Sequence, residues 1–212
     1  MKMKRFSKYL AILLMELTAC TPQHTDIKLQ TGDLLFRSEA TGQLSEAIDK
    51  VTQTGAETHF SHVGMVKVAG DSVFVLHASP RGGTCRIPLH KFLYPEDGPV
   101  KVVAYRLKKP WQSTIPKAVK QAENMLGKPY NFSYILSDSA HYCSEFIYRA
   151  FAADSVFTLT PMTFKDQQTG KFSPAWMAYY QKLGIEIPEG KPGCNPNGMA
   201  ASEKLDYIGI IK

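Results

Sequence analysis

Cys143 stands at the start of a helical pattern, in a position that favours a reactive thiolate. The apolar residues that follow it on one helical face are Phe146, Ile147, Ala150 and Phe151. The first turn of a helix stabilises negative charge, because its N–H groups lack helical partners and the helix dipole is positive there. Glu145 opposes this effect locally. A thiolate so placed is a nucleophile for a carbonyl carbon, and it needs a histidine nearby as its base.

Two histidines, His62 and His77, lie on strands that a short turn joins. Two β-rich runs flank the dipeptide Gly70-Asp71, which is a signal for a two-residue hairpin. With this turn, His77 lies opposite Gly64, and His62 shares its face because side chains alternate along a strand. Diagonal neighbours of this kind are roughly 7–8 Å apart at the backbone. We therefore predict that His62 is the base of the cysteine and that His77 orients it. A one-residue slip in the turn would break this arrangement.

Each of these residues also has an ordinary structural interpretation. A cysteine on an apolar helix is most often a buried small hydrophobe, and a lone strand histidine is usually structural. His62, His77 and Cys143 could together hold zinc, but the C-x-x-C or H-x-x-x-H spacing of most zinc sites is absent. We therefore expect neither a metal nor another cofactor. The remaining histidines, treated as background or rim residues, are His24, His59, His90 and His141.

Strand and helix patterns surround these residues. Strands are expected at 34–36, 62–68, 73–78, 85–87 and 100–107, and helices at 45–54, 115–126, 141–151 and 174–183. Ser173 is expected to cap the last helix, Pro174 to begin it and Gly184 to end it. The strands that follow the hairpin are expected to extend it as an antiparallel meander, and the proline-rich segment after the last helix is expected to be irregular. These patterns predict an α+β fold, with an antiparallel sheet or small barrel packed against the helix of the cysteine.

The first nineteen residues are typical of an export signal. A basic start precedes the apolar run 9–15, which is too short to span a bilayer permanently, and Leu17-Thr18-Ala19-Cys20 follows. A small residue directly before a cysteine resembles the bacterial lipobox, although Glu16 is unusual there. We predict a lipoprotein signal peptide at 1–19, a polar tether at 20–30 after a lipidated Cys20, and a single domain at 31–212. The alternative is an ordinary cleaved signal with a chance cysteine.

Composition and charge fit one globular domain with a short extra segment. The chain has 212 residues, of which 44% are hydrophobic, and a formal net charge of +6. Half of that charge lies in the first nineteen residues, so the rest is only mildly basic. This charge gives no reason to expect a nucleic-acid partner. We expect an exported monomer of the bacterial cell envelope that is anchored to the membrane by lipid.

Three cysteines remain in the expected exported domain: Cys85, Cys143 and Cys194. Export favours disulfides. A bond between Cys85 and Cys194 would leave Cys143 as the one free thiol, which is typical of a reactive cysteine. The sequence alone leaves this pairing open.

The order of the motifs resembles a known enzyme family. The run Leu-Gly-Lys-Pro-Tyr at 126–130, followed by Tyr-Cys-Ser-Glu-Phe at 142–146, is similar to the nucleophile segment of NlpC-type papain-fold hydrolases. In those enzymes the histidine strand follows the cysteine, whereas here Ser-His-Val-Gly-Met-Val at 61–66 precedes it. This order resembles the circularly permuted branch, the YiiX/YebB-like family, distantly akin to lecithin–retinol acyltransferase. Gly-Asp-Leu-Leu-Phe-Arg at 32–37 also resembles the opening strand of that branch, so the likeness covers roughly residues 32–151.

The resemblance implies a permuted papain-like fold and a role for each residue. Cys143 would be the nucleophile, with its backbone N–H as oxyanion donor, and His62 would be the base. The third polar residue falls at His77, where many YiiX-like members have glutamate and the acyltransferase-like relatives have histidine. A neutral imidazole can still accept the N–H of His62. Tyr130 and Tyr142 are candidate substrate-binding residues, with simple packing as the alternative.

The predicted activity is that of a cysteine hydrolase of the peptidase or amidase type, which forms an acyl-enzyme on an amide bond. The expected location in the envelope makes cell-wall peptide the first substrate candidate. His77 favours the alternative of a lipid ester or amide hydrolase, or an acyltransferase. A ligand-binding lipoprotein without catalysis is the remaining alternative.

Overall fold

An antiparallel sheet forms the centre of the protein, and its hairpin has the predicted register. The structure, a computed structural model, describes residues 27–39, 43–54, 58–96, 98–166 and 168–212. Strands β2 (His62–Ala69) and β3 (Ser72–Ser79) pair so that His77 lies opposite Gly64. Gly70 in the turn has a φ of 58°, which glycine adopts without steric cost. The turn chemistry therefore fixed the register that aligns the two histidines.

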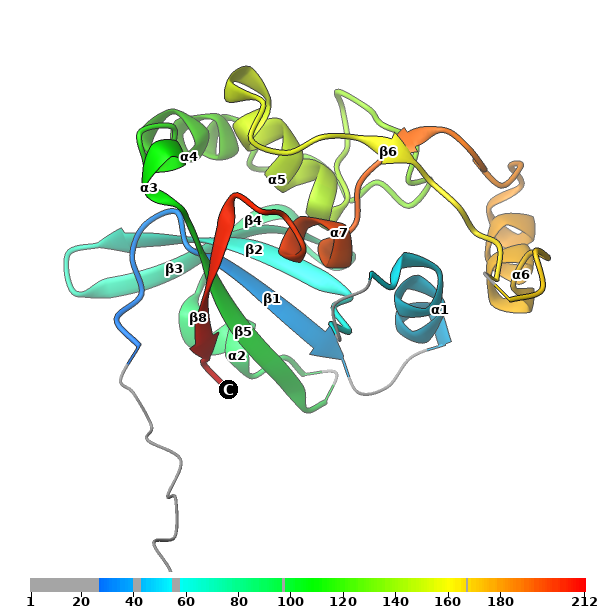
Figure 1. The fold of residues 1–212 in the computed structure, drawn as a ribbon, viewed down its shortest axis with the longest axis horizontal. Helices are drawn as coiled ribbons and strands as arrows, with labels where there is room; N and C mark the ends of the chain where they lie inside the picture. The colour runs from blue at the N-terminus through cyan, green and yellow to red at the C-terminus, as the bar shows by residue number, and fades with distance from the viewer. Residues whose placement is uncertain (1–26, 40–42, 55–57, 97, 167) are drawn as a thin grey trace, which may run out of the picture.

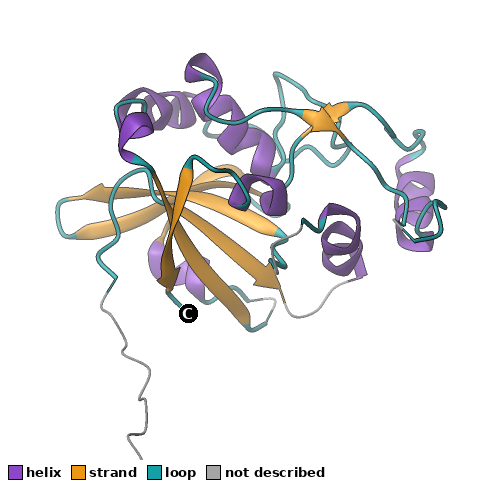
Figure 2. Cartoon of the chain, viewed as in Figure 1, coloured by secondary structure: helices purple, strands orange, loops and turns teal. Residues whose placement is uncertain are grey.

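Six strands form the sheet in the spatial order β4-β3-β2-β1-β5-β8 (Figures 1 and 2). The remaining strands are β1 (Leu34–Glu39), β4 (Gly83–Pro88), β5 (Val100–Leu107) and β8 (Leu205–Ile210), with the separate pair β6 (Thr160–Pro161) and β7 (Pro192–Gly193). The helices are α1 (Gln43–Thr52), α2 (Leu89–Leu93), α3 (Lys109–Gln112), α4 (Ile115–Asn124), α5 (Cys143–Phe151), η1 (Ala152–Asp154), α6 (Pro174–Leu183) and α7 (Pro196–Ala200).

Two expectations about the sheet were wrong. The meander ends at β4, because β5 pairs with β1 and not with β4. Helix α2 follows β4 and covers one face of the sheet (Figure 1). The chain then enters the sheet again as β5, on the other side of β1 from β2. The closing segment is not irregular throughout, because β8 adds an edge strand beside β5. Both pairings join segments that are distant in sequence, and no short-range signal specifies them.

The two faces of the sheet have different covers. Figure 1 shows α4 and α5 on one side and α2 on the other. Val63, Met65, Leu76 and Ala78 belong to the same core cluster as the α5 residue Phe146. On the opposite face, the cluster around Phe92 of α2 consists of Leu35, Val66, Val75, Val100, Val102 and Ala104. Because side chains alternate along β2 and β3, each strand contributes residues to both hydrophobic cores.

A third cluster lies beside the sheet, where α1 packs against α6. It contains Ala47 and Val51 of α1, Trp176 and Tyr180 of α6, and Phe164. Helix α6 begins at Pro174 and is closed by Gly184 with a φ of 69°, as predicted. This cluster forms one wall of the pocket described below.

The predicted signal peptide and Cys20 lie outside the described residues. Within the described ranges, no helix is long and apolar enough to span a membrane.

Candidate active site

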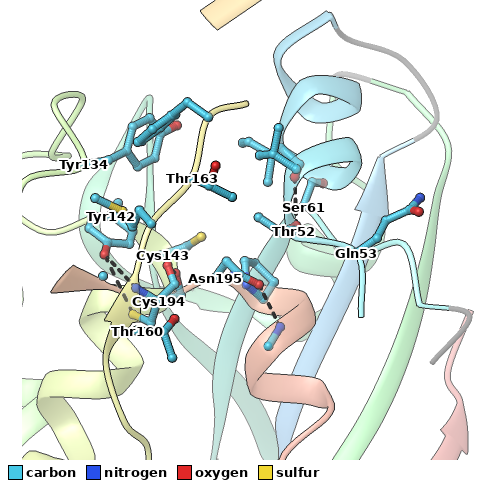
Figure 3. A pocket seen from close by; sticks show the side chains of 18 of the residues that line it. Thr52, Gln53, Ser61, Tyr134, Tyr142, Cys143, Thr160, Thr163, Cys194 and Asn195 are labelled. Atoms are coloured by element: carbon cyan, nitrogen blue, oxygen red, sulfur yellow. Dashed lines mark hydrogen bonds between the residues drawn. The ribbon is translucent and has the colours of Figure 1, made fainter. Parts of the chain in front are cut away.

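Cys143 is the first residue of α5 and lines a pocket of about 300 Å³. Tyr142 precedes it in extended conformation as the N-cap residue. The other lining residues come mainly from the end of α1, the segment 160–164 and the segment 193–198, with Ser61, Tyr130, Tyr134 and Trp176 beside them. Figure 3 shows Cys143 and Cys194 on one side of the pocket, and Thr52 and Ser61 on the other. The predicted nucleophile therefore stands at the positive end of a helix and beside a space that fits a small ligand.

The structure brings His62 and His77 together as predicted. Nε2 of His62 lies 2.8 Å from Nδ1 of His77, and both rings are buried. Phe92 packs against both rings, with centroids 5.7 and 5.6 Å away. A Cβ at Gly64 of β2 would meet the side chain of Val75, the Phe92 ring and the Cβ of His77, so a larger residue there would crowd the histidine pair. The two imidazoles therefore form a hydrogen-bonded pair, and the Phe92 ring packs against both of them.

The surroundings keep both imidazoles neutral. Burial, and then the nearby Arg37 guanidinium, lower the pKa of His77 to about 3. Burial, Arg37 and His77 hold the pKa of His62 well below its usual value. A neutral imidazole has one nitrogen that can accept a proton, so the pair is in the state that a general base requires.

The His62–His77 pair and Cys143 approach the site from different faces of the sheet. The pair points toward α2, whereas α5 packs on the other face. Among the described residues that line the pocket, neither imidazole is included. His62 is nevertheless the first residue of β2, and its neighbour Ser61 lines the pocket. The imidazole therefore lies at the end of the sheet, next to the pocket.

The nitrogen of His62 that does not face His77 remains available. Nδ1 of His62 has no hydrogen-bond partner among the described residues, and it is not one of their fully buried polar atoms. If Nε2 donates to His77, Nδ1 carries the lone pair that can take a proton. Catalytic hydrogen bonds are often long before substrate binds.

Tyr130 and Tyr142 both line the pocket, as predicted, and Tyr134 joins them. The rings of Tyr134 and Tyr142 lie 5.3 Å apart, and Trp176 lies 5.8 Å from Tyr134. Tyr134 has a φ of 57°, a left-handed conformation that is uncommon for an aromatic residue and that often marks functional sites. Tyr134 was not predicted as a site residue, although it lies in the same loop as Tyr130. The segment 160–164 was also missed, because no local signal for it exists.

The possible disulfide between Cys85 and Cys194 is not formed. None of Cys85, Cys143 and Cys194 is in a disulfide. Cys85 lies on β4 opposite His77, whereas Cys194 lies beside Tyr142, whose hydroxyl accepts a hydrogen bond from the Cys194 N–H at 3.2 Å. Burial raises the pKa of Cys194 to about 12 and also raises that of Cys85. Both of these thiols are therefore poor nucleophiles at neutral pH.

Glu145 fixes the loop before α5 to the helix. Its buried carboxylate accepts hydrogen bonds from the Ser137 N–H at 2.9 Å, Asn131 Nδ2 at 3.2 Å, the Tyr142 N–H at 3.4 Å and Arg149 Nε at 2.8 Å. Burial raises the pKa of Glu145, but contacts with His141, Ser137, Arg149 and Asn131 outweigh it and hold that pKa below its usual value. Because the carboxylate is already paired with Arg149, its effect on the cysteine is reduced.

Substitution of Glu145 tests this anchor. Glu145→Ala is expected to lower the free energy of unfolding by about 3–5 kcal/mol, because Arg149 and buried N–H groups lose their partner. Glu96→Ala, at an exposed ion pair, is the matched control and should change it by less than about 0.5 kcal/mol. Urea unfolding measures both. Equal effects of the two substitutions would contradict the anchoring role.

Comparison with known proteins identifies the class. Residues 28–209 match the family of permuted papain-like amidase enzymes of the YaeF/YiiX type, the C92 family. The chain belongs to this family, so the predicted resemblance, the α+β permuted papain-like fold and the enzyme class of cysteine peptidases and amidases are confirmed.

Two relatives from Escherichia coli are similar to the chain. The uncharacterized protein YiiX of strain K12 is 31% identical over 124 residues, which are 58% of this chain and 57% of that protein. The matched part therefore spans just over half of the curated relative. The crystal structure of the metalloprotein yiiX from strain O157:H7 superimposes with a TM-score of 0.67 at 24% identity, covering 84% of this chain and 96% of that chain. This likeness supports the fold.

Proposed function

We propose that the protein is a thiol acyl hydrolase that cleaves an amide bond through an acyl-enzyme on Cys143. The observation that carries the proposal is the position of Cys143, which begins α5 and lines a pocket next to a neutral pair of histidines. Family membership supports the same chemistry.

His62 would be the general base and acid, and His77 would position it. His62 Nδ1 takes the thiol proton, and the thiolate attacks the carbonyl carbon. Backbone N–H groups at the start of α5 stabilise the oxyanion. The C–N bond then breaks, the amine leaves with the proton from His62, and water hydrolyses the thioester. His77 holds the His62 ring through the 2.8 Å hydrogen bond and sets its tautomer.

A metal centre does not fit the described residues. The yiiX crystal structure is described as that of a metalloprotein. Within the ranges that the structure describes, no group of three His, Cys, Asp or Glu side chains could hold a metal ion. His62 and His77 bond to each other and do not converge on a common point with a third ligand. We therefore derive no step through a metal.

The substrate expected from an envelope lipoprotein is a cell-wall peptide, with a lipid amide or ester as the alternative. The predicted location rests on residues outside the described ranges, so it remains a prediction. The lining of the pocket favours the alternative, as argued below.

A thiol-directed chloroacetamide tests the nucleophile. Mass spectrometry should find Cys143 modified at least about ten times faster than a free peptide cysteine, because its thiolate is activated. Cys85 and Cys194 should react slowly, since burial raises the pKa of both thiols. His62→Ala should slow the labelling of Cys143. The proposal fails if Cys143 reacts no faster than the peptide, or if His62→Ala leaves its rate unchanged.

A further inference from the structure

The pocket beside Cys143 has an apolar wall opposite the nucleophile. Ile48 and Val51 come from α1, Met162 and Phe164 from the segment after β6, and Trp176 from α6. Phe164 and Trp176 pack edge to face, with centroids 5.0 Å apart, and both are buried. Trp176 is held in place because its Nε1 donates to the Ala47 carbonyl oxygen at 3.3 Å. This wall is a fixed surface for an apolar group.

No charged side chain lines the pocket among the described residues. The polar lining consists of hydroxyl, amide and thiol groups together with backbone. A ligand carboxylate or ammonium that entered this space would lose its hydration without gaining an ionic partner, which is costly. The acidic side chains of a cell-wall peptide would meet this penalty, whereas an alkyl chain would not.

Ser61 supplies a polar group to the pocket that the apolar wall and Cys143 share. Its Oγ is fully buried, lines the pocket through its residue and has no hydrogen-bond partner among the described residues. Buried hydroxyls without a partner are uncommon, because the unmade hydrogen bond costs free energy. Figure 3 shows Ser61 across the pocket from Cys143. Because this oxygen is covered by protein, a bound amide would give it a partner only after the side chain rotates toward the pocket.

From these features we infer that the pocket binds the uncharged acyl chain of a lipid-like amide and presents its carbonyl carbon to Cys143. The inference rests on the proposed function and names its substrate class. The alkyl chain lies against Ile48, Met162 and Trp176, and the amide lies between Ser61 and Cys143. A volume of about 300 Å³ fits a medium-length chain. The thiolate displaces the amine, which leaves protonated, and water then releases the fatty acid and restores the thiol.

A series of acyl p-nitroanilides from acetyl to decanoyl tests chain recognition in the full chain. Each buried methylene should raise kcat/KM roughly fourfold until the chain fills the pocket. An eight-carbon acyl group with a terminal carboxylate should react at least about 100-fold more slowly than octanoyl. Met162→Lys should flatten the series, because it places a charge in the apolar wall. Met177→Lys, at an exposed position on α6 outside this pocket, is the matched control and should leave the series unchanged.

Two further measurements separate failure of this inference from failure of the proposed function. Cys143-dependent hydrolysis that is indifferent to chain length, or that prefers a purified cell-wall peptide, would overturn the inference and leave the function standing. Activity that persists in Cys143→Ala would instead overturn the function. Calorimetry with the Cys143→Ala protein tests the pocket without turnover: octanamide should bind at least about tenfold more tightly than its analogue with a terminal carboxylate. Equal affinities, or no binding of octanamide, would overturn the inference.

Discussion

Replacing Cys143 with alanine is expected to lower kcat/KM for amide hydrolysis by at least about 10,000-fold. The covalent route is lost with the thiol, and only binding and oxyanion stabilisation remain. His62→Ala should cost about 1,000- to 10,000-fold, because the thiol then lacks its base. The double variant should be no worse than Cys143→Ala alone, since residues that act as one unit are not additive. Cys85→Ala, at a thiol on β4 outside the pocket, is the control and should keep wild-type activity.

The His62→Ala variant tests whether His62 is the base of Cys143. His62 and Cys143 approach the site from different faces of the sheet. Catalysis through His62 therefore requires its Nδ1 to reach the thiol around the end of β2. If Cys143→Ala abolishes activity and His62→Ala keeps it within threefold, the base is a different group. Melting temperatures within a few degrees of wild type would show that each variant is folded.

Short-range signals explain why the histidine pair and the cysteine helix were predictable. Gly70-Asp71 specifies a two-residue turn, and the turn alone determines which residues of β2 and β3 share a face. The apolar spacing after Cys143 likewise specifies the buried face of α5. Periodicity does not reveal which face of the sheet a helix will cover. That choice is made by long-range packing, and it placed α5 on the face opposite the imidazoles.

The pocket was only partly predictable for the same reason. Tyr130 and Tyr142 flank the nucleophile segment and were found with it, but the opposite wall comes from α1, the segment 160–164 and α6. These elements meet only in the tertiary structure, and their residues have ordinary apolar patterns. The absence of charge among the described lining residues is a property of the assembled site, so composition could not have predicted the substrate class proposed for it.

Lowering the pH is expected to destabilise the protein through His62 and His77. Both imidazoles have a folded pKa below the ordinary value of 6.5, because burial and Arg37 disfavour the charged form. Below about pH 6.5 the unfolded chain binds more protons at these sites than the folded protein does, so stability is fully present above that pH and is lost as the pH falls. Each histidine contributes about 1.4 kcal/mol per pH unit until its folded pKa is reached. For His77, whose folded pKa is about 3, the loss between pH 6 and 4 is roughly 2–3 kcal/mol, and the lowered pKa of His62 adds to the loss in the same direction.

Urea unfolding at pH 7, 6, 5 and 4 measures this dependence. The double variant His62→Gln with His77→Gln should show a shallower fall than wild type, because neither amide titrates. His90→Gln, at an exposed histidine on α2, is the matched control and should keep the wild-type slope. Identical slopes in wild type and the double variant would mean that other groups govern acid unfolding. The same burial keeps His62 neutral at neutral pH but makes it a weaker proton acceptor than an exposed histidine, so the packing that makes the pair vulnerable to acid also limits its strength as a base.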